Sequence, residues 1–243
     1  MPWERCRHGQ FHRLLLLALC VSRVGAQAAL PQKQQIDVSA RLAPLHHGQT
    51  HKPEEIHPAV IWLNPVRSGE APPVTPRNFT LLQKNKLFTP HLLVVPVGSS
   101  VAFPNADPFF HNVFSLFDGR RFDLGLYEAG STRSVVFSRE GVSYIFCNIH
   151  SEMSAVVIAL ATPYYGLVDT KGTFRVKGVP AGDYELHVWV EGQKQSSLDH
   201  LTRRVHIAAE TSDIGEISSG APEQQPHLNK FGQPYEPDPH PIY

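Results

Sequence analysis

The sequence predicts an all-β protein, and three observations lead to this prediction. Proline and glycine are frequent in the 243-residue chain, with 21 and 17 copies spread along it. Apolar and polar residues alternate in short runs, which is the pattern of half-buried strands. Turn-forming dipeptides separate these runs, and many short strands with regular turns indicate a sandwich or a barrel. We therefore expect a β-sandwich followed by a smaller β module.

Residues 1–28 have the composition of a secretory signal peptide. Arginines precede an apolar run from Leu14 to Val21, which is too short to span a bilayer, and Ala26-Gln27-Ala28 is a small-residue cleavage site. We expect export to the periplasm, or secretion, with no membrane span afterwards. Removal of four arginines and one glutamate from 22 basic and 22 acidic residues leaves a formal charge of −3. This near balance gives no electrostatic footprint for nucleic acid.

After residue 28 the chain keeps one cysteine, Cys147, and one methionine, Met153, because Met1, Cys6 and Cys20 precede the cleavage site. A lone cysteine in an oxidising compartment cannot form an internal disulfide, and its free thiol is open to oxidation. Metal ligation would occupy the thiolate and so explain why the cysteine is kept. The alternative is an inert buried thiol.

Strand-like segments fill the first predicted domain, residues 29–161. Alternation predicts a strand at 36–42, and a second strand follows at 59–63. The polar loop between them carries His46, His47, His51 and His57, whose spacing fits no compact metal geometry. Turn signals separate the remaining predicted strands, which are 79–83, 92–97, 100–103, 111–116, 132–137, 142–147 and 154–160.

A smaller second unit is predicted at 162–216, and a tail follows it. Alternating apolar residues predict strands around 174–176, 184–188 and 201–207, which make a small core that leans on the first domain. Residues 217–243 are rich in Pro, Gln and His, with little apolar content. We expect them to form a disordered or surface-hugging tail.

A thiol, an imidazole and a thioether lie within seven residues in the pattern Cys147-x2-His150-x2-Met153. Copper suits such a mixture of soft and borderline ligands, and a second imidazole would complete a His2Cys site with a weak axial methionine. His111, at the start of a predicted strand, is the best candidate. We also expect Asn112 to hold the ligand loop against this strand, with Asn148 beside it. Phe109, Phe110 and Phe114 would supply an apolar shell that excludes water.

These residues resemble the cupredoxins, or blue copper proteins. The pattern Phe103-Pro-Asn105, Asp107, His111-Asn112-Val113, followed by Cys147-x2-His150-x2-Met153, is similar to that of plastocyanin and especially amicyanin. The resemblance covers residues 85–161 and implies a Greek-key β-sandwich that binds one mononuclear type 1 copper ion. It implies that His111, Cys147 and His150 are the strong ligands, that Met153 is the axial ligand, and that His150 lies nearer the surface.

The second unit has a resemblance of its own. The pattern Asp169-x2-Gly172-x-Phe174, continued by Val179-Pro-Ala-Gly182-x-Tyr184, resembles carboxypeptidase regulatory-like (transthyretin-like) domains, which are usually non-catalytic β-sandwich modules. The whole arrangement resembles bacterial periplasmic proteins labelled plastocyanin-like or methylamine-utilisation proteins. That label does not establish an amine substrate.

The function expected from these patterns is one-electron transfer with unidentified redox partner proteins, without catalysis. The chain has no glycine-rich phosphate loop and no Gly-x-Ser-x-Gly nucleophile turn. Two alternatives stay open: a copper carrier or sequestering protein, and an interaction module that binds no metal tightly. A copper oxidase would need a second, open copper site, for which only the His46–His57 loop is available. The sequence does not determine the oligomeric state.

Overall fold

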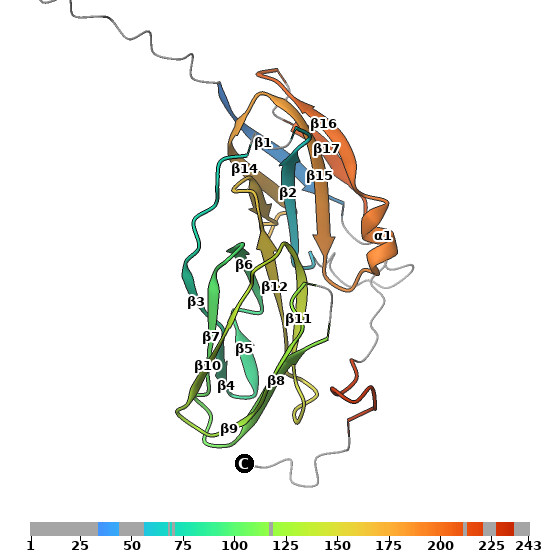
Figure 1. The fold of residues 1–243 in the computed structure, drawn as a ribbon. Helices are drawn as coiled ribbons and strands as arrows, with labels where there is room; N and C mark the ends of the chain where they lie inside the picture. Colours follow the sequence, from blue (N-terminus) through green and yellow to red (C-terminus); the bar gives the residue numbers. More distant parts are fainter. Residues whose placement is uncertain are drawn as a thin grey trace, which may run out of the picture. The chain divides into compact units, whose positions relative to one another are not determined.

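The chain folds almost entirely into β-strands, which confirms the predicted fold class (Figure 1). The computed structural model describes residues 34–43, 56–67, 69, 71–116, 119–210, 213–220 and 227–235. The predicted signal peptide and the histidines at 46, 47 and 51 lie outside these residues. Within them the elements are β1 (Gln35–Leu42), β2 (Ala59–Pro65), β3 (Asn78–Thr80), β4 (Leu82–Lys84), β5 (Leu87–Thr89), β6 (Leu92–Pro96), β7 (Ser100–Pro104), β8 (His111–Ser115), β9 (Phe122–Tyr127), β10 (Thr132–Val136), β11 (Gly141–Cys147), β12 (Ser154–Leu160), β13 (Tyr165–Leu167), β14 (Thr173–Pro180), β15 (Gly182–Val190), α1 (Gln195–Asp199), β16 (Arg203–Ile207) and β17 (Asp213–Ile217).

The first β-sandwich contains all of the predicted ligands. Its larger sheet has the strand order β6-β12-β11-β8-β9, and its smaller sheet has the order β10-β7-β3. Side chains from both sheets, among them Phe103, Val113, Val135 and Ile145, form one buried core. Because β6 and β12 run parallel, as do β3 and β7, the chain must cross between the sheets. The sandwich predicted from the short strands after residue 78 is therefore present.

The second β-sandwich is completed by strands from the beginning of the described chain. Strand β1 lies between β14 and β17 in one sheet, and β2 lies between β13 and β15 in the other. The prediction that the strands at 36–42 and 59–63 belong to the first unit is therefore wrong. Alternation showed that one face of β1 is buried, but it does not say which sheet covers that face. Without β1 and β2, each sheet of the second unit would lack a middle strand.

Strand β12 is buried on both faces and joins the two sandwiches. Its sequence, Ser-Ala-Val-Val-Ile-Ala-Leu, is a continuous apolar run, as a strand covered on both sides requires. Alternate residues contact the two cores: the first core takes Ala155, Val157 and Ala159, and the second takes Val156, Ile158 and Leu160. The part of the outer face of the ligand-bearing sheet that β12 forms thus belongs to the second core.

Four strands and the helix have no counterpart among the predicted segments: β5, β9, β13, β17 and α1. Each is short or interrupted. In β9, Gly125 has a φ of +66°, and the register shifts opposite residues 112–114, so the alternation of a regular strand is lost. Helix α1 has only five residues, too few for a helical period to be visible in the sequence.

Residues 217–243 were expected to form a disordered or a surface-hugging tail, and the described residues of this stretch agree with the surface-hugging alternative. Ile217 is fully buried at the end of β17, and residues 227–235 lie against the first sandwich. The amide of Lys230 donates to Asn148 Oδ1 at 2.9 Å, and Lys230 Nζ lies 2.8 Å from Asp123 Oδ2. Hydrogen bonds and ring contacts hold residues 227–235 in place. The low apolar content of the sequence does not reveal such contacts.

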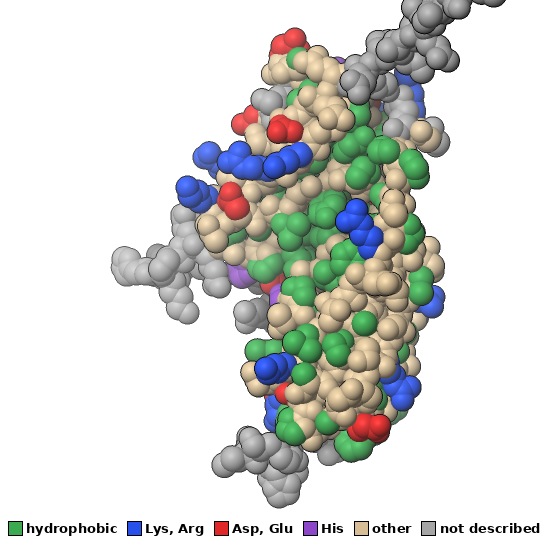
Figure 2. Space-filling view, turned by 90° about the vertical axis from the view of Figure 1, so that its left-hand side faces the viewer, with side chains coloured by type: hydrophobic (Ala, Val, Ile, Leu, Met, Phe, Trp, Pro, Cys, Tyr) green, Lys and Arg blue, Asp and Glu red, His purple; other side chains and the backbone are tan. Residues whose placement is uncertain are grey.

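The surface carries charges of both signs. On the face shown in Figure 2, basic and acidic side chains are interspersed among hydrophobic and other polar side chains. This distribution agrees with the equal numbers of basic and acidic residues in the sequence. Among the described residues, no helix has the length and hydrophobicity needed to cross a membrane.

Candidate metal centre

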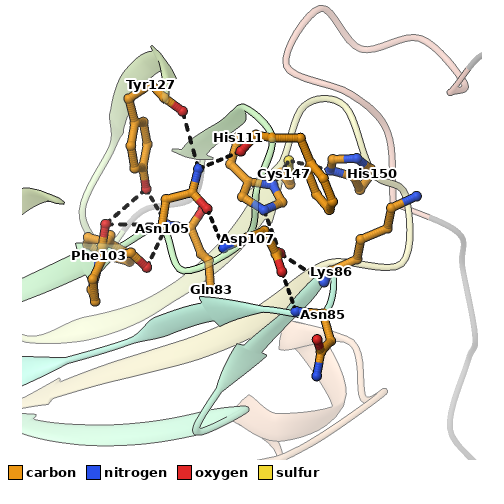
Figure 3. Close-up of polar contacts among 12 residues, drawn as sticks. Gln83, Asn85, Lys86, Phe103, Asn105, Asp107, His111, Tyr127, Cys147 and His150 are labelled. Carbon is orange, nitrogen blue, oxygen red and sulfur yellow. Dashed lines mark hydrogen bonds and ion pairs between the residues drawn. The ribbon is translucent and has the colours of Figure 1, made fainter. Parts of the chain in front are cut away.

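His111, Cys147 and His150 form one buried cluster (Figure 3). Cys147 Sγ lies 3.7 Å from His111 Nδ1 and 3.6 Å from His150 Nδ1, and the three donor atoms all lie within 4.8 Å of one another. A metal bound to a thiolate at about 2.3 Å and to imidazoles at about 2.0 Å holds sulfur and nitrogen roughly 3.6–3.8 Å apart. The observed spacing therefore fits three ligands of one ion.

The sheet and one tight loop bring these residues together. His111 begins β8 and Cys147 ends β11, and these strands are neighbours in the larger sheet. After Cys147 the loop folds back, because the Met153 amide donates to His150 O and the Cys147 amide donates to Met153 O. The Asn148 amide donates to Asn112 O at 3.0 Å and so ties the loop to β8.

The donor set is that of a mononuclear copper site. Two imidazole nitrogens and one thiolate suit a metal that accepts soft sulfur together with borderline nitrogen, and copper has this preference. Met153 is fully buried in the same core as Cys147, so its thioether lies in the apolar region around the cluster. His150 is 7% exposed and His111 is 0% exposed, which agrees with the expectation that His150 lies nearer the surface.

Asp107 holds His111 in place, a role that the sequence alone does not reveal. His111 Nε2 donates to Asp107 Oδ2 at 2.9 Å, which leaves Nδ1 to face Cys147. The carboxylate also accepts the amides of Asn85 and Lys86, at 2.6 and 3.0 Å (Figure 3). Burial raises the pKa of Asp107, but the bonds from Lys86, His111 and Asn85 together bring its pKa below the usual value. Asp107 therefore remains a carboxylate at neutral pH.

In the metal-free cluster, the His111 imidazole and the Cys147 thiol are both uncharged at neutral pH. Burial lowers the pKa of His111, and the bond to Asp107 offsets this only in part, so Nδ1 carries a free lone pair at neutral pH. Burial likewise raises the pKa of the Cys147 thiol, against the opposing effect of the amides of Asn112, Ile149 and His150. The thiol is therefore protonated at neutral pH, and metal binding must displace its proton.

A hydrogen-bond network fixes the turn before His111. Asn105 Oδ1 accepts the Asp107 amide at 3.0 Å, and Asn105 Nδ2 donates to Phe109 O at 2.7 Å. The Phe109 ring lies 5.3 Å from the His111 ring and 5.4 Å from the His150 ring, between ring centroids. The turn thus delivers both the carboxylate that orients His111 and an aromatic cover for the two imidazoles. The motif Asn105-x-Asp107 was visible in the sequence, but not its bond to His111.

The four predicted neighbours of the ligands have different roles. Phe110 is 54% exposed and Phe114 packs against Phe146 outside the core of Cys147, so the prediction that both line the site is wrong. Successive side chains of a strand point to opposite faces of the sheet. Phe114 is three positions after His111 in β8, so its ring lies on the face opposite to the His111 imidazole. Asn112 does hold the ligand loop, but through its backbone oxygen, while Asn148 contacts both β8 and the C-terminal segment.

Asp107→Asn is expected to weaken copper binding about 10- to 100-fold, as changes to the partners of metal-ligating histidines do. The amide cannot accept from His111 with the strength of a carboxylate, and it leaves the neighbouring amides less well bonded. Competition titration against a chelator measures the dissociation constant. Asp183→Asn is the matched control, because Asp183 accepts from the exposed His206 in the second sandwich. Equal copper affinity in the two variants would contradict the orienting role of Asp107.

The structure resembles solved cupredoxins over about a third of its length. A purple cupredoxin from Nitrosopumilus maritimus is 23% identical and covers 34% of this chain and 99% of its own, with a TM-score of 0.31. A methionine-to-alanine mutant of amicyanin in its Cu(I) form is 17% identical and covers 34% of this chain and 82% of its own, with a TM-score of 0.33. The Cu-containing nitrite reductase NirK from Thermus scotoductus SA-01 is 24% identical and covers 40% of this chain, with a TM-score of 0.33.

The match to the nitrite reductase spans 25% of that enzyme. The sequence matches no protein-family model and no curated protein. Because these likenesses are low in identity and TM-score, the assignment of copper rests on the donor atoms of His111, Cys147 and His150 and on their spacing.

Proposed function

We propose that the protein is an exported type 1 copper protein that transfers single electrons between partner proteins. The observation that carries this proposal is the buried cluster of one sulfur and two imidazole nitrogens at the spacing of a shared ion. Copper bound there supplies the Cu(II)/Cu(I) couple. In this proposal Met153 is the weak axial ligand that tunes the potential, as the loop spacing and its burial beside Cys147 suggest.

Rigid support of the ligands favours electron transfer over release of the ion. His111 is held by Asp107, the loop is closed by the bonds between Cys147, His150 and Met153, and the Asn148 amide fastens it to β8. A site that keeps one geometry in both oxidation states needs little rearrangement when an electron arrives. His150, the more exposed imidazole, provides the route to a docked partner.

The remaining features of the proposal come from the sequence patterns. Residues 1–28 would direct the chain to the periplasm. The second sandwich would be a transthyretin-like, non-catalytic module, and its pattern of turns and strands from Asp169 to Tyr184 supports this. A copper carrier is the second candidate, because the same buried donor set would also serve to sequester the ion.

Redox cycling of copper-loaded residues 29–243 separates the two candidates. We expect the blue colour to bleach with ascorbate and to return with ferricyanide over many cycles, at about one electron per copper, with the metal retained after gel filtration. A carrier would instead lose reduced copper to a chelator within one cycle. Failure of the colour to return while copper stays bound would contradict the electron-transfer proposal.

A further inference from the structure

The outer face of the ligand-bearing sheet carries two aromatic rings that belong to neither core. Phe146 of β11 and Phe114 of β8 are paired across the sheet, with ring centroids 5.9 Å apart. They nevertheless have exposures of only 9% and 1%. His227 of the C-terminal segment stacks on Phe146 at 4.1 Å between centroids and 24° between planes. Residues 227–235 therefore cover part of this face. This segment follows strand β17 in the sequence, and Figure 1 shows it in dark red.

The same segment hydrogen-bonds to a ligand residue directly. Tyr235 Oη donates to Cys147 O at 2.7 Å, and the Tyr235 oxygen lies 3.2 Å from His227 Nδ1. If the pairing of β11 and β12 continued, the Met153 amide would face the Cys147 carbonyl, but it donates to His150 O. Tyr235 thus supplies a donor to the Cys147 carbonyl at the point where the ligand loop leaves the sheet.

Lys230 anchors the segment at two further points beside the cluster. Its amide donates to Asn148 Oδ1 in the ligand loop, and its ammonium group lies 2.8 Å from Asp123 Oδ2 in β9. The other oxygen of Asp123 accepts from Asn112 Nδ2 at 2.6 Å, and Asn112 follows His111 in the chain. The segment is therefore connected to both strands that carry ligands and to the loop between the sulfur and the second histidine.

We propose that residues 227–235 form a C-terminal strap that supports the metal centre, in which Tyr235 is a positioning residue for Cys147. This inference rests on the proposed function. The strap covers the aromatic face behind the ligand strand, and the Tyr235 hydroxyl fixes the carbonyl end of Cys147 while Lys230 fixes the loop that follows. The hydrogen end of the Tyr235 O–H dipole faces Cys147, so it favours the more electron-rich, reduced form of the site.

Tyr235→Phe tests the proposal because it removes the hydroxyl and keeps the ring. We expect the variant to bind copper and to be blue, because all ligands remain, but to have a lower potential than the unaltered protein. The affinity for Cu(I) relative to Cu(II) should fall about 3- to 10-fold, which is about 30–60 mV for one electron. The EPR hyperfine splitting should change with it. Tyr165→Phe is the matched control, since Tyr165 lies on β13 in the second sandwich.

A second measurement uses the metal-free protein. The amide of Lys230, bonded to Asn148 Oδ1, should exchange with solvent about 2- to 10-fold faster in Tyr235→Phe than in Tyr165→Phe. Identical potential, EPR spectrum and Lys230 exchange in the two variants, in a protein that is blue and redox-active, would overturn the strap while leaving the proposed function intact. A colourless unaltered protein that does not retain copper would overturn both.

Discussion

Replacing Cys147 with serine is expected to abolish the intense blue absorption of the copper-loaded protein. The visible band of such a site requires a thiolate bound to copper, and serine offers only a hydroxyl at the same place. Copper affinity should also fall by more than about 100-fold, since loss of a ligand exceeds the effect of losing a partner of a ligand. Visible and EPR spectra, together with a chelator competition, measure both changes.

Met153→Leu provides the contrast, because it removes the proposed axial ligand and keeps the thiolate. This variant should stay blue with a shifted potential. A blue Cys147→Ser variant would exclude Cys147 as the source of the colour.

The pH dependence of copper binding gives a further check. Since burial raises the pKa of the Cys147 thiol, the unaltered protein should release about one proton per copper at neutral pH. Its copper affinity should rise with pH until the thiol ionises.

Trp189→Ala is expected to lower the free energy of unfolding by about 3–5 kcal/mol, the range for removing a large buried aromatic side chain. Trp189 is 1% exposed in the second core, and its Nε1 donates to Tyr144 Oη of β11 at 3.1 Å. The substitution opens a cavity and removes the indole donor from Tyr144, between strands of the two sandwiches. Urea unfolding of the metal-free protein, followed by circular dichroism, measures the loss.

Trp189→Phe separates packing from hydrogen bonding. It keeps an aromatic ring but removes the indole donor, so together with Tyr144→Phe and the double variant it gives a coupling energy of about 0.5–1.5 kcal/mol. Since β12 contributes to both cores, one unfolding transition is expected for both sandwiches. A change below about 1 kcal/mol in Trp189→Ala would show that this position is not part of a shared core.

Local patterns were sufficient to predict the strands around the site and the cluster itself. Alternation in Val142–Cys147 put Ser143, Ile145 and Cys147 on one face, and all three are fully buried. The spacing from Cys147 to Met153 allowed the three side chains of a single loop to converge on one point. His111 was the best candidate for the further nitrogen because it begins a predicted strand flanked by phenylalanines. These features follow from the two-residue period of a strand and from the preferences of metal ligands.

Local sequence patterns do not show which strands pair with each other when they lie far apart in the chain. Strand β1 shows which of its faces is apolar, but its partners β14 and β17 lie more than a hundred residues away. The bond from Asp107 to His111 depends on how the turn folds, and the contacts of Tyr235 and Lys230 depend on polar atoms from a segment with little apolar content. Such contacts leave no periodic signal.

The sequence by itself determined the all-β class, the short-strand sandwich around the site and the residues that form the cluster, because side-chain period and ligand chemistry are local properties. Only the tertiary structure decided which strands complete the second sandwich, which carboxylate orients His111, and where the C-terminal segment lies. Those outcomes depend on which surfaces meet, and the free energy of burying one face against another belongs to the folded chain as a whole.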